Sequence, residues 1–331
     1  MNNLLKITNL KTDFRGERNI VHAVRDVSFT VLEGETFGLI GESGCGKSAT
    51  CRSIINLLKE NGEIAGGEVC YGGQDITKLS QKQMNQIRGH EIGMIFQEPM
   101  STLNPIVKIE TQLTESMPKE MTREEKRNRA VELLKLVGIS DAKQRLGAYS
   151  YELSGGMRQR VMIAAALAAS PKVLLADEPT TALDVTIQSQ ILELLMKLKQ
   201  ELGMSMILVT HDLGVAAQVC DRIAVMYAGQ IVEIADEKDI FYATRHPYTH
   251  GLLCSMPSMQ KKGDMLIPIE GMPPDLREDI CGCSFAPRCR FCTEKCRQEN
   301  PELKLVGAGH YSRCFYAETL TLHAEQEEGK L

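Results

Sequence analysis

Residues 41–48 read GESGCGKS and fit G-x-x-x-x-G-K-[ST], the pattern of a phosphate-binding loop. The apolar stretch TFGLI at Thr36–Ile40 precedes this loop, and a segment with helical character, 47–58, follows it. In this order of strand, loop and helix, the loop amides and the helix N-terminus all face a bound polyphosphate. The sequence therefore predicts a nucleotide site within an α/β fold.

The loop residues supply different groups to a bound nucleotide. Lys47 can reach the β- and γ-phosphates, and the Ser48 hydroxyl can coordinate Mg²⁺. At Cys45 only the backbone amide is needed. The residues expected to contact ATP are Gly41, Ser43, Gly44, Cys45, Gly46, Lys47, Ser48 and Ala49.

A second apolar stretch, at 173–178, reads VLLADE and ends in two adjacent acids. The carboxyl ends of parallel strands are where a doubly wound sheet exposes its reacting groups. Asp177 is expected to hold Mg²⁺ through water, and Glu178 to polarise the attacking water. The sequence VTHD places His211 at the end of the next expected strand, where it can contact the γ-phosphate. These residues predict hydrolysis as well as binding.

The sequence around these motifs alternates between strand and helix patterns. The first 40 residues repeat with period two and predict antiparallel strands. Residues 80–150 have helical spacing and predict a mainly α-helical insert. From 157 to 230, helices alternate with apolar strands, which predicts a parallel sheet covered on both faces.

The composition limits the classes of protein that fit. The chain has 331 residues, of which 43% are hydrophobic and 24% charged, as expected of a large globular core with an appendage. Its net charge of −5 argues against a nucleic-acid partner. The most apolar stretch, 161–176, contains Pro171 and Lys172 and falls short of the about 18 apolar residues of a membrane span. Because no signal peptide is evident either, we expect a cytosolic protein that reaches the membrane through a partner.

Residues 153–160, LSGGMRQR, resemble the signature sequence that distinguishes ABC ATPases from other phosphate-loop enzymes. Around it, Gln97 in IFQEP resembles the Q-loop of that family, 182–184 its D-loop, and His211 its switch histidine. The resemblance implies an α/β fold, the ABC ATPase cassette. This cassette has a phosphate-loop core with a parallel sheet, an N-terminal antiparallel β subdomain and an α-helical subdomain. Here a small Cys-rich C-terminal extension would follow it.

In this family a serine hydroxyl and two glycine amides bind the γ-phosphate of ATP held by the opposite subunit. That role would fall to Ser154, Gly155 and Gly156. The resemblance thus implies a head-to-tail dimer with a second ABC ATPase subunit, either a paralogue or another copy. It also implies two transmembrane permease subunits, an extracytoplasmic solute-binding protein that acts indirectly, and a location on the cytoplasmic face of the cell membrane.

The resemblance also assigns residues outside the two apolar strands. Gln97 is implied both as a catalytic residue and, with Ser48 and Asp177, as a ligand of Mg²⁺. Asp184 of the D-loop is implied in nucleotide contact. Phe14, in a turn-like FRGER segment, is the candidate for stacking on adenine, with a core position as the alternative.

Three rival functions fit these residues less well. A single uninterrupted cassette without a heptad run argues against the ABC ATPases of DNA repair and translation. The sequence 154–156 argues against a phosphate-loop kinase or GTPase, which should lack it. The presence of Glu178 and His211 argues against a binding module with inactive chemistry.

The sequence after residue 240 resembles a narrower group. Residues 241–257, FYATRHPYTHGLLCSMP, are similar to the segment that follows the core in the ATPase subunits of dipeptide and oligopeptide importers. The resemblance implies a nucleotide-binding domain at 1–245, with its helical subdomain at about 98–160, and an extension at 246–331. It implies a short peptide as cargo. Nickel and opine importers share this architecture, so uptake of such chelates is the alternative.

Six of the 11 cysteines lie between 281 and 314. Within the resemblance, four of them match positions that can hold a [4Fe–4S] cluster. An alternative is a zinc site that begins with the C-x-x-C at 289–292, and a third is a set of free thiols. A cluster would act as a structural staple for an extension with little core of its own. The four cysteines are Cys283, Cys289, Cys296 and Cys314.

Overall fold

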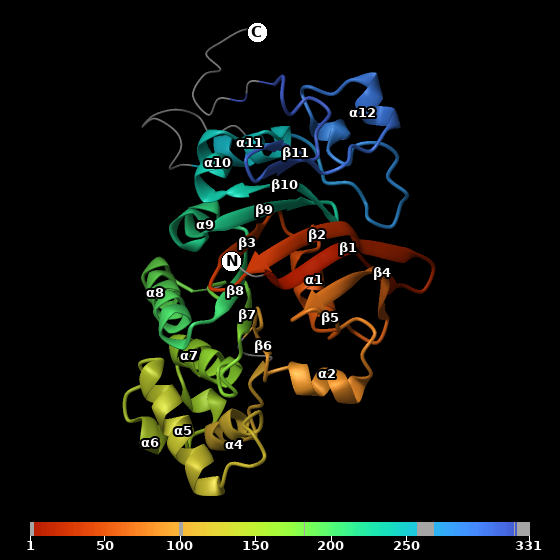
Figure 1. Ribbon diagram of the computed structural model, residues 1–331. Helices are drawn as coiled ribbons and strands as arrows, with labels where there is room; N and C mark the ends of the chain where they lie inside the picture. Colours follow the sequence, from red (N-terminus) through yellow and green to blue (C-terminus); the bar gives the residue numbers. More distant parts are fainter. Residues whose placement is uncertain (1–2, 99–101, 182, 257–267, 321, 323–331) are drawn as a thin grey trace. The chain divides into compact units, whose positions relative to one another are not determined.

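The computed structural model describes residues 3–98, 102–181, 183–256, 268–320 and 322, which fall into two compact units (Figure 1). The phosphate-loop unit contains the described residues within 4–30, 36–77 and 210–331. The signature unit contains Asn3, 31–35 and the described residues within 78–209. Among the residues described, none of the helices combines the length and apolarity needed to cross a membrane.

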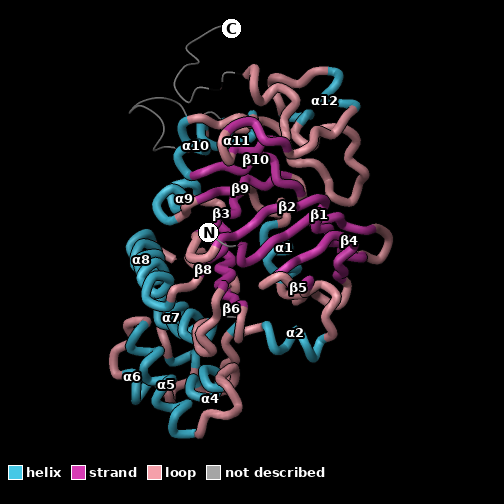
Figure 2. The backbone as a smooth tube through the Cα atoms, viewed as in Figure 1, coloured by secondary structure: helices cyan, strands magenta, loops and turns pink. Residues whose placement is uncertain are grey.

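The phosphate-loop unit is built mainly of strands, which Figure 2 shows in magenta. Its strand order is β5-β4-β1-β2-β10-β9-β3, and β12 pairs with both β10 and β11. The strands are β1 (Asn3–Arg15), β2 (Ile20–Leu32), β3 (Thr36–Ile40), β4 (Gly62–Tyr71), β5 (Gln74–Asp75), β9 (Arg222–Tyr227), β10 (Gln230–Asp236), β11 (Lys304–Gly307) and β12 (His310–Ser312).

Strand β3 leads into the phosphate loop, and all five of its residues are buried, as the apolar sequence predicts. It runs parallel to β9, with Ile40 opposite Val225. Helix α1 (Lys47–Ile54) follows the loop but is shorter than the predicted 47–58. Asn56 has a left-handed φ of +48°, and its N–H turns back to the Ser53 carbonyl. A non-glycine residue in this conformation cannot continue a right-handed helix, so the helix ends before it.

The signature unit places helices around a parallel sheet of β6 (Ile92–Ile95), β7 (Val173–Asp177) and β8 (Ser205–Thr210). Helix α7 contacts β6, and α4 and α5 both contact α7. The alternation of helix and strand expected after residue 157 is confirmed. The helices are α2 (Gln81–Ile87), α4 (Ile109–Thr114), α5 (Arg123–Leu136), α6 (Ala142–Arg145), α7 (Gly155–Ala166) and α8 (Val185–Leu202).

Strand β6 lies within residues 80–150, where the sequence predicts a mainly helical insert, and is therefore a correction to that prediction. Its sequence IGMI is short, and all four residues are buried, so it lacks the alternation that marks a half-exposed strand. Because Gly93 has no side chain, the end of helix α7 can approach β6 closely. A Cβ added at Gly93 would lie 2.6 Å from the Ala166 carbonyl oxygen at the end of α7.

The extension has short elements joined by buried polar contacts. Its helices are α11 (Pro247–Cys254) and α12 (Glu294–Gln298), with a 3₁₀ turn, η3, at Ala286–Arg288. Helices α9 (Leu213–Val219) and α10 (Glu237–Tyr242) precede the extension. The fully buried Glu233 of β10 accepts a hydrogen bond from Thr244 at 2.9 Å and lies 2.7 Å from His310 Nε2. Arg313 pairs with Asp26 at 3.0 Å. These buried hydrogen bonds and ion pairs help to fix the extension, whose apolar core is small.

His246 caps helix α11 and is almost completely buried, at 1% exposure. Its Nδ1 accepts a hydrogen bond from the Tyr248 backbone N–H at 3.1 Å, which requires a neutral ring. Burial lowers the pKa of His246 from 6.5 to about 4. Between these two values the unfolded chain binds a proton that the folded chain does not, so this contribution to stability is full above about pH 6.5 and is lost as the pH falls to about 4.

Between pH 7 and pH 4, we expect the free energy of unfolding of the wild type to fall by about 3 kcal/mol more than that of His246→Asn. The asparagine amide oxygen can still cap the helix but does not titrate in this range. Urea unfolding at a series of pH values measures this difference. Two parallel pH profiles would show that His246 is not the titrating group.

Candidate nucleotide-binding and catalytic site

The phosphate loop follows a tightly curled path that its glycines permit. Gly44 and Gly46 have φ values of +78° and +104°, which favour glycine. A Cβ added at Gly46 would lie 2.3 Å from the Ala23 carbonyl oxygen, and one at Gly41 would lie 2.2 Å from the Met226 carbonyl oxygen. The loop therefore has no room for side chains where it passes β2 and β9.

Lys47 lies across this loop and is buried, at 5% exposure. Its Nζ donates hydrogen bonds to the carbonyl oxygens of Gly41 (2.8 Å) and Glu42 (2.9 Å). Because these acceptors are uncharged, phosphate oxygens can replace them as stronger, charge-assisted partners. Cys45 is buried next to it, and burial raises the pKa of its thiol. Of the other predicted ATP contacts, Ser43 and Gly44 are exposed, and Ser48 and Ala49 are half-buried at the start of α1.

Two more predicted residues lie in the same unit. Phe14, near the end of β1, is half-buried, and a Cβ added at Gly62 would lie 2.7 Å from its ring, so part of the ring packs on the backbone there. His211 is exposed and directly follows β8. The next residue, Asp212, caps α9 by accepting a hydrogen bond from the Gly214 N–H at 2.8 Å.

In the signature unit, two predicted catalytic residues are in contact. The amide nitrogen Nε2 of Gln97 donates a hydrogen bond to Glu178 Oε2 at 3.0 Å. The two residues follow β6 and β7, which are parallel neighbours, so both emerge at the same edge of the sheet. Asp177, the last residue of β7, is fully buried. Sequence reasoning predicted each residue separately but not this contact.

Glu178 has an unusual backbone conformation, with a φ of +48°. Its N–H donates to the Val209 carbonyl at 3.0 Å. A non-glycine residue held in this region stores strain of the order of 1–3 kcal/mol, and such strain concentrates at functional sites. The Thr181 hydroxyl donates a second hydrogen bond to Glu178 Oε2 at 2.7 Å. Thr181 was not predicted, and its only sequence signal is its place three residues after the acid.

The signature sequence forms the start of helix α7. Ser154 is the N-cap, and its hydroxyl accepts from the Met157 N–H at 3.4 Å. Gly155 has open space around it, with no atom within 4 Å of an added Cβ. This exposed helix N-terminus, with a hydroxyl and glycine amides, has the groups that bind an anion. Gln159, which was not predicted, is buried and donates to the Pro179 carbonyl, so it joins α7 to the segment after Glu178.

Asp184 is the N-cap of helix α8, which begins at Val185. Its carboxylate accepts from the Ile187 N–H at 2.9 Å and caps the helix. Ala182 of the predicted D-loop lies outside the described residues.

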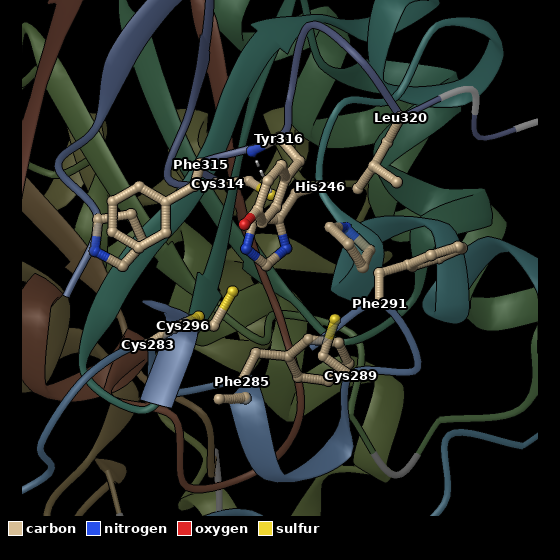
Figure 3. Close-up of a pocket in the computed structure, with 13 residues that line it drawn as sticks. His246, Cys283, Phe285, Cys289, Phe291, Cys296, Cys314, Phe315, Tyr316 and Leu320 are labelled. Atoms are coloured by element: carbon tan, nitrogen blue, oxygen red, sulfur yellow. Dashed lines mark hydrogen bonds between the residues drawn. The ribbon is translucent and has the colours of Figure 1, made fainter. Parts of the chain in front are cut away.

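The extension contains a small pocket lined by sulfur and aromatic side chains (Figure 3). The four cysteines that the resemblance singles out all line it, whereas Cys281 is exposed and Cys292 is not among the lining residues. Burial raises the pKa of Cys289 to about 12 and that of Cys314 to about 11. It also raises the pKa of Cys283. These thiols are therefore protonated at neutral pH in the arrangement described.

Within the described ranges, no three His, Cys, Asp or Glu side chains are placed to hold a metal ion. A zinc ion needs its ligands to converge at about 2.0–2.3 Å from one point. Among the described residues, the structure therefore shows a formed ligand set neither for the zinc alternative beginning at 289–292 nor for the predicted iron–sulfur cluster.

Known proteins resemble this chain over almost its whole length. Residues 24–181 match the family model of the ABC transporter, and residues 232–296 match that of the oligopeptide/dipeptide transporter, C-terminal region. A probable peptide ABC transporter ATP-binding protein of Sinorhizobium fredii is 47% identical over 316 residues, which are 94% of each chain. The dipeptide transport ATP-binding protein of Bacillus subtilis is 46% identical over 327 residues, which are 98% of each chain.

A comparison with solved structures also points to an ATP-binding cassette. A solved dimeric ATP-binding cassette, in a post-hydrolysis state bound to ADP and Pi, is 32% identical with a TM-score of 0.63. The match covers 70% of this chain and 98% of that one. The predicted α/β cassette fold is confirmed, and the chain belongs to the ABC transporter family as one of its ATP-hydrolysing, ATP-binding subunits.

Proposed function

We propose that this chain is the ATP-hydrolysing subunit that energises an importer of short peptides. The observation that carries the hydrolytic part is the Gln97–Glu178 hydrogen bond at the ends of two parallel strands. The C-terminal region of the oligopeptide/dipeptide type, together with the names of its relatives, supports the peptide cargo. The proposal assigns 1–245 to the nucleotide-binding domain, with its helical subdomain at about 98–160, and 246–331 to the extension.

The phosphate loop would bind the triphosphate of the substrate ATP. Lys47 already directs its cation at loop carbonyls, so binding exchanges these acceptors for the β- and γ-phosphate oxygens. The loop amides would complete the phosphate contacts, and Phe14 would stack on adenine through the part of its ring that does not pack on Gly62.

Glu178 would act as the general base. Gln97 and Thr181 both donate to its Oε2, and two donors on one oxygen fix the carboxylate in a single orientation. A fixed carboxylate can accept the proton of the attacking water as the bond from the water oxygen to the γ-phosphorus forms and the bond to the β,γ-bridging oxygen breaks, which releases ADP. His211 would orient that water.

The residues proposed to hold Mg²⁺ are Ser48, Gln97 and Asp177. Their hydroxyl, amide and carboxylate oxygens are the hard ligands that this ion prefers, and the donor set therefore fits. When bound, Mg²⁺ would neutralise charge on the β- and γ-phosphate oxygens. The chain's own contribution is the buried strand end that fixes Asp177.

The N-terminus of α7 would complete the site of a second ATPase subunit, either a paralogue or another copy. Ser154, Gly155 and Gly156 would bind the γ-phosphate held by that subunit, and Asp184 would lie at the same interface. The proposed assembly adds two permease subunits and an indirectly acting solute-binding protein. It places this chain on the cytoplasmic face of the membrane.

Uptake by cells that lack this chain tests the cargo. We expect such cells to lose uptake of a labelled dipeptide and to retain uptake of nickel chelates. Loss of nickel uptake with normal dipeptide uptake would instead assign the motor to chelate transport.

We further propose that the cysteine pocket holds a [4Fe–4S] cluster. Four thiols line this pocket, which is the ligand count of such a cluster. Ligands of a four-iron cluster surround it rather than converge on one ion, so they need not lie as close together as zinc ligands. When bound, the cluster would cross-link four separate segments of the extension. Phe285, Phe291 and Phe315 would shield it from water.

Metal analysis of protein purified without oxygen tests this proposal. We expect about four irons and four acid-labile sulfides per chain, lost in Cys314→Ser and retained in Cys281→Ser. The control cysteine is exposed and lies outside the pocket. One zinc per chain, or protein without any metal, would contradict the cluster.

A further inference from the structure

Arg288 is a buried cation of the extension whose side chain is only 4% exposed. Both of its terminal nitrogens donate to the carboxylate of Glu42, at 2.8 and 3.1 Å. The remaining donors reach Tyr227 Oη (3.4 Å) and the carbonyl oxygens of Ile269 (3.2 Å) and Glu270 (3.0 Å). A guanidinium has five N–H donors, so all of them are used. This geometry fixes Arg288 and the carboxylate together.

Glu42 is the second residue of the phosphate loop, and the extension also holds its backbone. The Glu42 N–H donates to the Tyr248 hydroxyl oxygen at 3.1 Å. Tyr248, in α11, is fully buried. The centroid of its ring lies 4.5 Å from the ring centroid of Tyr227 and 5.4 Å from that of Phe285. Two residues of the extension thus hold Glu42: Tyr248 binds its main chain, and Arg288 binds its side chain.

The same residue holds the loop lysine. The Glu42 carbonyl oxygen accepts from Lys47 Nζ at 2.9 Å, so its position determines where one of the lysine's acceptors lies. A displacement of Glu42 changes the curl of the loop and the direction of the cation. Since phosphate contacts depend on this geometry, small displacements cost affinity.

The turn that carries Arg288 lies between two cysteines that line the cysteine pocket, although Arg288 itself is not one of the lining residues. It is the last residue of η3, and the turn is closed by the Ala286 N–H on the Cys283 carbonyl (3.0 Å) and by the Cys289 N–H on the Ala286 carbonyl (3.3 Å). Cys283 and Cys289 line the pocket on either side of this turn. A change in the separation of these two cysteines therefore moves the backbone that carries Arg288.

We propose that Arg288 is a positioning residue for the phosphate loop, and that the cysteine pocket sets its position, so that the extension tunes nucleotide affinity. The inference rests on the proposed nucleotide-binding role of the loop. It does not depend on which group the cysteines hold, because any change in their spacing is transmitted through η3.

Equilibrium binding of a fluorescent ATP analogue to the purified full chain tests the first part. We expect Arg288→Met and Glu42→Gln each to raise the Kd about ten-fold, and the double variant to lie within about two-fold of either single one, because each change breaks the same contact. The neighbouring Arg290→Met is the matched control and should stay within about two-fold of the wild type. An unchanged Kd in Arg288→Met, or effects that multiply in the double variant, would overturn the proposal.

Tyr248→Phe distinguishes a positioning effect from a folding defect, because it removes only the hydroxyl that accepts the Glu42 N–H and keeps the ring. We expect about a three-fold rise in Kd with the circular dichroism spectrum unchanged. If the residue served stability alone, the melting temperature would fall while the Kd of the folded protein stayed the same. That result would also refute the positioning role.

Cys289→Ser tests the second part. It should weaken nucleotide binding in the wild-type background but not further in Arg288→Met, whereas Cys281→Ser should have no effect in either. Equal weakening in both backgrounds, or none, would show that the pocket does not act through Arg288. Failure of the proposed function is distinct from these outcomes: in that case the wild type itself would not bind the nucleotide analogue.

Discussion

Replacing Glu178 with glutamine is expected to lower steady-state ATP hydrolysis at least about a hundred-fold, because a general base contributes about 10²–10⁴ to a rate. Glutamine has the same shape, and its amide oxygen can still accept from Gln97 and Thr181, so the local structure is preserved. It cannot take a proton from water. The protein should therefore bind ATP without turning it over, and a dimer closed around ATP should accumulate.

Phosphate release and retained nucleotide, measured on the same purified sample, check this result. Glu193→Gln is the matched control, since Glu193 is exposed on α8 and should leave turnover unchanged. Retention of wild-type hydrolysis in Glu178→Gln would remove Glu178 from the catalytic role. Loss of ATP binding as well would mean that the residue shapes the nucleotide pocket rather than the chemistry.

Replacing Lys47 with alanine is expected to raise the Kd for ATP about 10- to 100-fold. The change removes a buried cation, and charge-assisted hydrogen bonds contribute about 1.5–3 kcal/mol each. It also leaves the carbonyl oxygens of Gly41 and Glu42 without this donor, which loosens the curl of the loop. Binding and hydrolysis should thus fall together, unlike in Glu178→Gln.

Isothermal titration with ATP measures this effect. The exposed Lys59→Ala, just after α1, provides a control with the same change in net charge. If Lys47→Ala bound ATP as tightly as the wild type, the phosphate-loop assignment would be wrong, whatever its hydrolysis rate.

The phosphate loop could be predicted from sequence because its determinants are local. Glycines at 41, 44 and 46 are required by positive φ values or by close backbone neighbours, and the sequence pattern records these requirements directly. The strand before the loop could also be predicted, because its sequence TFGLI is largely apolar. All five of its residues are buried in the structure. Only the length of α1 was overestimated, because one asparagine in a left-handed conformation carries no strong local signal.

Contacts between distant segments could not be predicted. The Gln97–Glu178 hydrogen bond depends on β6, a four-residue strand whose burial on both faces hides any alternation. The Glu42–Arg288 pair joins residues 246 positions apart, and neither residue stands out in its own segment. In both cases tertiary packing, rather than local preference, decides the position of the side chain.

The cysteines lie between these two cases. Their number and clustering predict metal ligands or free thiols, but spacing does not decide which four share a pocket. The structure places Cys283, Cys289, Cys296 and Cys314 around it, and burial keeps three of them protonated by raising their pKa.

Dipeptide uptake in cells that lack this chain and are supplied with either the wild type or Glu178→Gln tests most directly whether hydrolysis at this residue powers import. Immunoblotting of membranes would confirm that both proteins are present in equal amounts. We predict that the wild type restores uptake and that Glu178→Gln leaves it at the level of the deletion. Uptake restored equally by both proteins would contradict the account.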